Sequence, residues 1–193
     1  MDNIAGNVLQ RNLSKVFPNK LVANATEVLF IMLMGMAAIT LHAKLRIPMH
    51  LPGKQGIIFM LLVVMTRSVS KFGFASSLFC FSSALLLFTN ALGFEDPFMP
   101  LVYILMGIVM DILFRINSRF SQSIILTAFF SGLCWLSIPV FRLLLGSFFG
   151  FKYLSFSGGL IFPFFTHFIF GFAGGIAGAA IIYSMNKRSA SAK

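Results

Sequence analysis

The chain has 193 residues, of which 58% are hydrophobic and only 10% are charged, and its mean hydropathy is +0.92. This composition excludes an ordinary water-soluble domain, in which about a quarter of the residues carry charge. The net charge of +10 does not indicate a nucleic-acid partner either, because the basic residues are scattered at the ends of apolar segments and form no continuous basic stretch.

Six apolar segments follow a polar tail at residues 1–23, and turn signals such as Pro52-Gly53 and Glu95-Asp96-Pro97 separate them. A helix needs about 20 apolar residues to cross the hydrocarbon layer of a bilayer. We therefore predict an all-α, polytopic membrane protein that forms a single six-helix domain over residues 1–193. The predicted spans are 24–43, 55–71, 73–93, 98–114, 122–145 and 159–184.

The distribution of Lys and Arg predicts the orientation of this bundle, since short basic connections stay preferentially on the cytoplasmic side. We expect both termini to be cytoplasmic, because this arrangement puts the larger share of the basic residues inside. The inner residues would be Arg11, Lys15, Lys20, Arg67, Lys71, Arg115, Arg119, Lys187, Arg188 and Lys193, and the outer ones Lys44, Arg46, Lys54, Arg142 and Lys152.

Small residues mark two spans as places where another helix can approach closely. The last span carries Gly171, Gly175 and Gly178 among several alanines, and the first carries Gly35 and Ala38. Packing within the bundle explains them, and docking of a partner helix is the alternative.

We expect Asp111 to be the only carboxylate within an apolar span, where an unpaired charge is costly. Arg115 follows four residues later on the same helix face, and Arg67 is expected at a similar depth in the second span. We interpret the three as a structural ion pair near the cytoplasmic surface, with a proton or ion relay as the alternative.

Another set of polar and aromatic side chains falls in the outer connections and the outer halves of the spans. A small-molecule site needs an apolar pocket with a few placed polar groups, so we expect the substrate contacts there. They are Arg46, His50, Asp96, Trp135, Arg142 and His167. Neither a metal nor a cofactor is expected, because the three histidines are far apart in sequence and have no carboxylate or thiol beside them.

Enzyme activity is not expected either, since the chain lacks the motifs of intramembrane metalloproteases and of nucleotide hydrolases. The sequence Phe156-Ser157-Gly158-Gly159 also differs from the serine motif of rhomboid proteases, and His167 follows it too closely on the same span.

The first span is followed by Lys44-Leu45-Arg46-Ile47-Pro48-Met49, and the last span is rich in Gly and Ala between Gly171 and Ala180. In these features and in its six predicted spans, the chain resembles the substrate-binding S-component of energy-coupling factor (ECF) vitamin transporters. The Arg-Ile-Pro exit from the first helix recurs in that family, and the resemblance in architecture covers about residues 24–184.

The resemblance implies uptake of a small molecule such as a vitamin across the bacterial cytoplasmic (inner) membrane. It also implies a membrane coupling subunit and cytoplasmic ATPases as partners. That subunit would dock on an Ala-x-x-x-Ala pattern in the first helix, from which Gly35 and Ala38 depart. Two alternatives remain open: a membrane scaffold or assembly factor that binds another membrane protein through the Gly-rich helix, and a solitary cobalamin transporter with Cys80 or Cys134 as the cobalt ligand.

Overall fold

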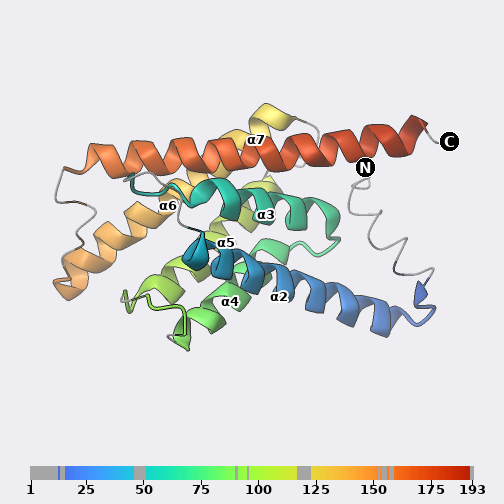
Figure 1. Ribbon diagram of the computed structural model, residues 1–193, viewed down its shortest axis with the longest axis horizontal. Coiled ribbons are helices and arrows are strands. Elements are labelled where there is room, and N and C mark those ends of the chain that lie inside the picture. The colour runs from blue at the N-terminus through green and yellow to red at the C-terminus, as the bar shows by residue number, and fades with distance from the viewer. Residues whose placement is uncertain are drawn as a thin grey trace.

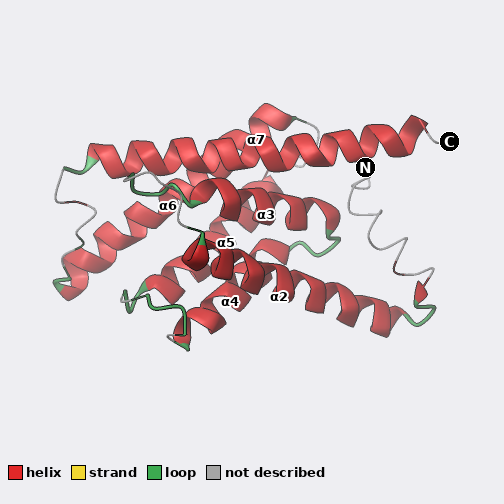
Figure 2. Cartoon of the chain, in the orientation of Figure 1, coloured by secondary structure: helices red, strands yellow, loops and turns green. Residues whose placement is uncertain are grey.

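The computed structural model describes residues 13, 16–45, 51–89, 91–94, 96–116, 123–151, 153, 156 and 159–191, with the backbone alone at 186 and 188–191. The secondary structure of this part of the chain is helical (Figures 1 and 2). The helices are α2 (Lys20–Lys44), α3 (Gly56–Val69), α4 (Ala75–Phe88), α5 (Met99–Ile116), α6 (Ile124–Phe149) and α7 (Ile161–Ser191). The predicted all-α architecture is confirmed for these residues.

Four of the helices are long and apolar enough to cross a membrane: α2, α5, α6 and residues Ile161–Met185 of α7. The chain therefore has the elements of a membrane protein. Helices α3 and α4, which correspond to the second and third predicted spans, have only 14 residues each. At 1.5 Å per residue each is about 21 Å long, which is shorter than the ~30 Å hydrocarbon layer.

Local backbone chemistry explains where the helices begin and end. Asn19 and Ser123 cap α2 and α6 by accepting hydrogen bonds from Leu21 N and Leu126 N. Helix α4 ends at Phe88, earlier than the predicted limit at residue 93. Helix α6 runs past the predicted limit at residue 145 and ends at Phe149, where the following Gly150 closes the last turn with a φ of 69°.

The helices pack around α3, which contacts α7, α2, α4 and α6. Phe59, Met60, Val63 and Val64 of α3 are fully buried in the core. Helix α7 also packs along α6, while α4 lies between α2 and α5. The short helix α3 lies between α7 and α2 in Figure 1.

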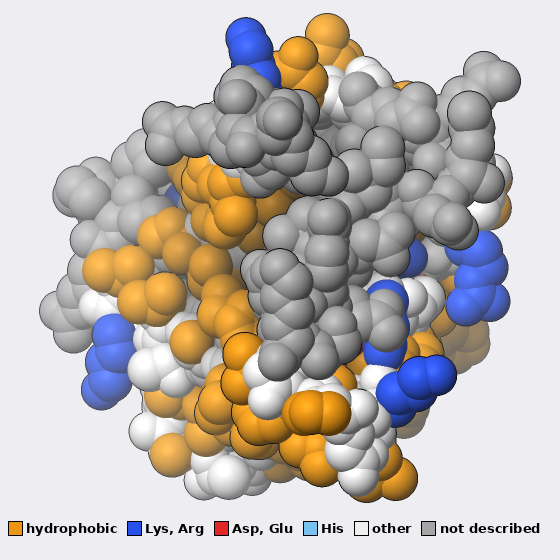
Figure 3. Space-filling model, turned by 90° about the vertical axis from the view of Figure 1, so that its right-hand side faces the viewer, with side chains coloured by type: hydrophobic (Ala, Val, Ile, Leu, Met, Phe, Trp, Pro, Cys, Tyr) orange, Lys and Arg blue, Asp and Glu red, His pale blue; other side chains and the backbone are white. Residues whose placement is uncertain are grey.

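The two ends of the bundle differ in character. We call the end at which α2 begins and α7 ends the terminal end, and the opposite end the loop end (Figure 1). Figure 3 looks onto the terminal end and shows Lys and Arg side chains at several places around it. Exposed Lys20, Arg115 and Lys187 belong to helix segments at this end.

Candidate binding site at the loop end of the bundle

Five aromatic rings from five helices form a continuous chain of contacts near the loop end. This aromatic cluster consists of His42 (α2), Tyr103 (α5), Phe59 (α3), Trp135 (α6) and His167 (α7). The Tyr103 hydroxyl lies 2.8 Å from His42 Nδ1, and the Phe59 ring centroid lies 5.0 Å from Tyr103 and 5.5 Å from Trp135. Trp135 and His167 are stacked at 6.2 Å. The cluster joins α2 to α7 across the core.

The turn that precedes α3 covers one side of the aromatic cluster. Trp135 Nε1 donates a hydrogen bond of 2.9 Å to Gly53 O. Gly53 has a φ of 79°, and a Cβ there would come within 2.7 Å of the His167 ring. At Gly56 a Cβ would collide with the Trp135 indole. Glycine at both positions lets the turn lie directly on the two rings.

An ion pair at the loop end joins α6 to the α4–α5 connection. Arg142 Nη2 lies 3.0 Å from Asp96 Oδ2, and the side chains are 21% and 16% exposed. Tyr153 stacks on the Arg142 guanidinium at 5.4 Å, and its hydroxyl lies 3.5 Å from Asp96 Oδ1. We call these three residues the Asp96 junction. Burial, and then the negative charge of Asp96, raise the pKa of the Tyr153 phenol.

The Asp96 junction and the aromatic cluster are connected through α6, which carries both Arg142 and Trp135. Three polar atoms in this region are buried without a hydrogen-bond partner: Arg142 Nε, Gln55 Oε1 and Asp96 Oδ2, the last of which faces Arg142 Nη2 in the ion pair. Gln55 immediately precedes Gly56 and donates through Nε2 to Leu45 O. The loop end therefore has buried aromatic rings together with one hydrogen-bond donor, Arg142 Nε, and one acceptor, Gln55 Oε1, that have no partner in either a hydrogen bond or an ion pair.

Four of the six predicted substrate contacts lie in this region: Asp96 and Arg142 form the ion pair, and Trp135 and His167 are stacked. The other two, Arg46 and His50, lie outside the described residues. The sequence pattern did not indicate Tyr103, Phe59, Tyr153 or Gln55 as members of the site, and it suggested His42 only as a metal ligand. The useful signal was the scarcity of tyrosine, since Tyr103 is one of only three in the chain.

The histidines of the aromatic cluster are engaged in hydrogen bonds. His42 Nδ1 faces the Tyr103 hydroxyl, and His167 Nδ1 lies 2.7 Å from Pro163 O. Within the described part of the chain, no three His, Cys, Asp or Glu side chains come together as a metal site would require.

Asp111 lies towards the terminal end and accepts four interactions. Ser76 N and Ser77 N donate to it at 3.1 and 2.7 Å, the Ser77 hydroxyl donates at 2.6 Å, and Arg67 Nε lies 3.3 Å away. The carboxylate thus caps the N-terminus of α4 and pairs with α3. Of the two arginines considered as its partner, Arg67 forms the ion pair, whereas Arg115 is exposed and lies beside Gly73.

Glu27 on α2 is a second buried carboxylate at this end. It is 1% exposed and accepts hydrogen bonds from Ser70 Oγ at 2.7 Å and Lys71 N at 3.0 Å. Its second oxygen lies 3.9 Å from Lys71 Nζ. Glu27 falls within the first predicted span, so the expectation that Asp111 is the only carboxylate in a span is wrong. Together Glu27 and Asp111 hold the α3–α4 connection from two sides.

The small residues singled out for helix packing are covered by helices of the same chain. A Cβ at Gly35 would collide with Phe79 O of α4, and Ala38 is fully buried. Gly171 and Gly175 face α6, while Gly178 faces Leu61 and Val64 of α3. Close packing inside the monomer accounts for these positions.

Both cysteines lie in the core. Cys80 and Cys134 are fully buried, and Cys134 Sγ donates to Met106 O at 3.2 Å. Their packing is that of small apolar side chains.

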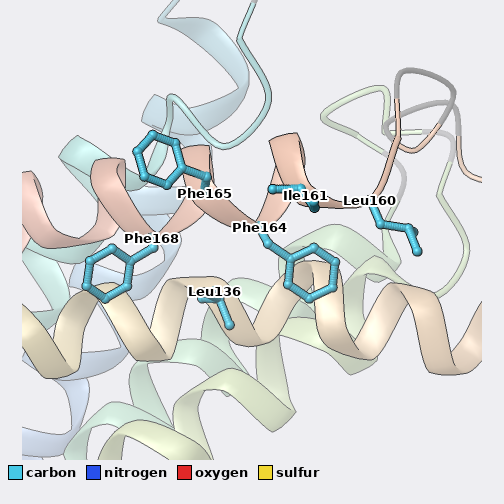
Figure 4. Close-up of a pocket in the computed structure, with 6 residues that line it drawn as sticks. All are labelled: Leu136, Leu160, Ile161, Phe164, Phe165 and Phe168. Carbon is cyan, nitrogen blue, oxygen red and sulfur yellow. The ribbon is translucent and has the colours of Figure 1, made fainter.

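A groove between α6 and α7 opens on the outside of the bundle. It has a volume of about 370 Å³ and is lined by Leu136, Leu160, Ile161, Phe164, Phe165 and Phe168. Figure 4 shows Phe164 and Phe168 directed towards α6. The lining is entirely apolar, as expected of a surface in contact with lipid chains.

Comparison with known proteins gives no relative: no protein-family model, no curated protein and no solved structure matches the chain.

Proposed function

We propose that the protein is the substrate-binding subunit of a transporter that takes up a small molecule across the bacterial cytoplasmic membrane, like an ECF S-component. The observation that carries this proposal is the aromatic cluster with the Asp96 junction beside it at the loop end. Side chains from five helices and two connections converge there, and binding sites in helix bundles are built in this way.

Buried polar groups lie at both ends of the bundle. Asp111 and Glu27 bond to backbone N–H groups around the α3–α4 connection, which is a structural use of charge. At the loop end Arg142 Nε and Gln55 Oε1 are buried without hydrogen-bond partners, and atoms of Glu27, Thr66, Arg67 and Ser76 are buried in the same way at the terminal end. Buried polar groups without partners cost stability, and a ligand that bonds to them removes that cost.

The proposed topology has six crossings with both termini in the cytoplasm, so that the loop end faces outward. Exposed Lys20, Arg115 and Lys187 lie towards the terminal end and favour this orientation. Arg46 and His50 in the first outer connection remain expected contacts. The energy for transport would come from a coupling subunit and ATPases, because the chain carries no phosphate-binding loop.

The two alternative functions, a membrane scaffold and a solitary cobalamin transporter, gain no support. The Gly-rich face that suggested a scaffold is covered by α3 and α6. Cobalt ligation would need an accessible thiolate, whereas Cys80 and Cys134 are buried in the core.

Mass spectrometry of molecules released from gently purified protein tests the proposal. We expect a stoichiometric small molecule from the wild type and from Arg115→Ala, whose side chain lies far from the loop end. Arg142→Ala should weaken binding by about 1–3 kcal/mol, the usual effect of losing a charge-assisted hydrogen bond. Arg142→Lys keeps the charge opposite Asp96 and controls for misfolding. Absence of any bound small molecule from folded wild-type protein, together with no uptake in cells, would refute the proposal.

A further inference from the structure

The exposed charge of the part of the chain that the structure describes is entirely basic. Its exposed charged side chains are Lys20, Lys44, Arg115 and Lys187. We infer that the protein selects anionic phospholipids as its neighbours in the membrane and binds their phosphate groups through Lys20, Lys44 and Lys187. This inference rests on insertion into a membrane and is independent of the proposed transport.

The carboxylates that the structure describes do not neutralise this surface, because each of them pairs with a basic residue of the same chain. The carboxylates are at most 16% exposed, and the pairs are Glu27–Lys71, Asp96–Arg142 and Asp111–Arg67. Exposed cations attract partners of negative charge. The partner that complements this surface is therefore anionic.

Helix α2 places its two end lysines at the depth of lipid head groups. Lys20 and Lys44 are the first and the last of its 25 residues, so the rise between them is about 36 Å. The hydrocarbon layer of a bilayer is ~30 Å thick, and the bilayer with its head groups is ~40–45 Å thick. When α2 crosses the membrane, both ammonium groups thus extend beyond the hydrocarbon and reach the phosphate groups of the two leaflets.

Helix α7 has the same design at the terminal end. Its apolar part runs from Ile161 to Met185, and exposed Lys187 follows within one helical turn. The ammonium group therefore lies at the border of the apolar region, where the head groups of the adjacent leaflet begin.

Exposed apolar side chains beside these lysines distinguish a lipid from a water-soluble polyanion. Leu21 and Leu45, which follow the two lysines of α2, are 75% and 42% exposed, and Tyr183, one turn before Lys187, is 58% exposed. Figure 3 shows Lys and Arg side chains close to hydrophobic ones on the terminal end. An amphiphile matches this pattern, because its phosphate meets the cation while its acyl chains cover the apolar side chain. A soluble polyanion would leave the apolar side chains in water.

Native mass spectrometry of the full-length protein in mild detergent tests this selectivity. The protein is stripped of lipid and then offered an equimolar mixture of phosphatidylglycerol and phosphatidylcholine with identical acyl chains. The readout is the ratio of the two bound lipids, and heparin is added in a second series as a soluble polyanion. Two matched triple variants are compared, one with Gln and one with Arg at positions 20, 44 and 187.

We expect the wild type to bind at least about threefold more phosphatidylglycerol than phosphatidylcholine, because each lysine near an anionic head group adds a favourable charge interaction. The Arg variant keeps the three charges and should keep this ratio, whereas the Gln variant should bring it close to one. Raising the salt concentration from about 0.1 M to about 1 M should lower the ratio in the wild type, since it screens these charges. Without lipid the three proteins should melt at similar temperatures, because the substituted side chains are exposed.

A ratio near one in the wild type, or an unchanged ratio in the folded Gln variant, overturns the inference. If the Gln variant does not fold, Lys20→Gln and Lys44→Gln are measured singly, and each should lower the ratio. Displacement of all bound phosphatidylglycerol by heparin would identify a soluble polyanion as the preferred partner and refute the lipid. The proposed function fails separately, when folded protein releases no small molecule and supports no uptake, and that result would leave the lipid ratio unchanged.

Discussion

The partners of Asp111 indicate that this buried carboxylate has a structural role. Both of its oxygens face donors: two backbone N–H groups of α4, the Ser77 hydroxyl and the Arg67 guanidinium. In Asp111→Asn one oxygen becomes an NH₂ group that points at other donors. We expect a loss of about 3–5 kcal/mol in unfolding free energy, the usual effect of breaking a buried pair from one side.

A thiol-reactive dye can follow unfolding of this variant, because Cys80 and Cys134 are buried until the core opens. Arg115→Gln, at an exposed side chain, should change stability by less than about 0.5 kcal/mol. Asp111→Asn should lower the ligand affinity less than it lowers the free energy of unfolding. Unchanged stability with lost uptake would instead identify Asp111 as part of an ion relay.

Because of Tyr153 at the loop end, the free energy of unfolding should depend on pH. Burial and the charge of Asp96 raise the pKa of its phenol above the ordinary value of 10.0. Between the ordinary and the raised pKa the folded protein keeps a proton that the unfolded chain releases. Unfolding free energy therefore falls as pH rises above about 10. Phenolate absorbance of wild type minus Tyr153→Phe should titrate above pH 10, and Tyr153→Phe should lose less stability over this window. Titration at or below pH 10 would contradict the contact with Asp96.

Single residues also show what sequence can and cannot predict here. Helical spacing correctly put Asp111 and Arg115 on one turn, but spacing is local, and the ion pair is made by Arg67 because α3 packs close by. The contact of His42 with Tyr103 joins positions 61 residues apart. Nothing in a single sequence relates two such positions. Trp135 and Arg142 were easier to select, since they are unusual residues in an apolar helix.

At the scale of helices, Gly35 sets the distance between α2 and α4. Ser83 Oγ donates to Gly35 O at 2.8 Å, and any Cβ at Gly35 would collide with Phe79 O. Gly35→Ala should therefore destabilise the protein by about 1–3 kcal/mol or more, as overpacking does in rigid cores. Gly73→Ala is the matched control, because its Cβ would meet only the Arg115 side chain at 3.6 Å. Equal melting temperatures for the two variants would argue against this close packing.

The helices themselves were well predicted as elements and less well at their ends. Long apolar runs identify a helix because the bilayer allows few other structures. The ends depend on capping groups and on neighbours: Thr89 closes α4 early, and α6 continues into the aromatic segment that was predicted as a connection. Hydropathy could not show that α3 is the central helix, since central and lipid-facing helices are equally apolar.

For the whole molecule, the basic bias predicts the orientation. Reporter fusions after residue 96 and after residue 193 should report the outside and the inside, respectively. Substitution of Lys20, Arg115 and Lys187 by Gln should weaken this preference, whereas substitution of Lys54 should not. An inside signal at residue 96 would reverse the bundle and move the candidate site to the cytoplasmic face.

The unequal helix lengths have a consequence for the surrounding membrane. Helix α4, with 14 residues, presents about 21 Å of apolar height through Phe81, Leu85 and Phe88, whereas the 25-residue apolar part of α7 presents about 38 Å. The two helices lie on opposite sides of the molecule (Figure 1). In the proposed six-span arrangement a bilayer of uniform thickness would not match both helices, so it would thin beside α4 or the bundle would lean. The proposed arrangement is thus wedge-shaped towards its lipids, and membrane thickness would set its tilt.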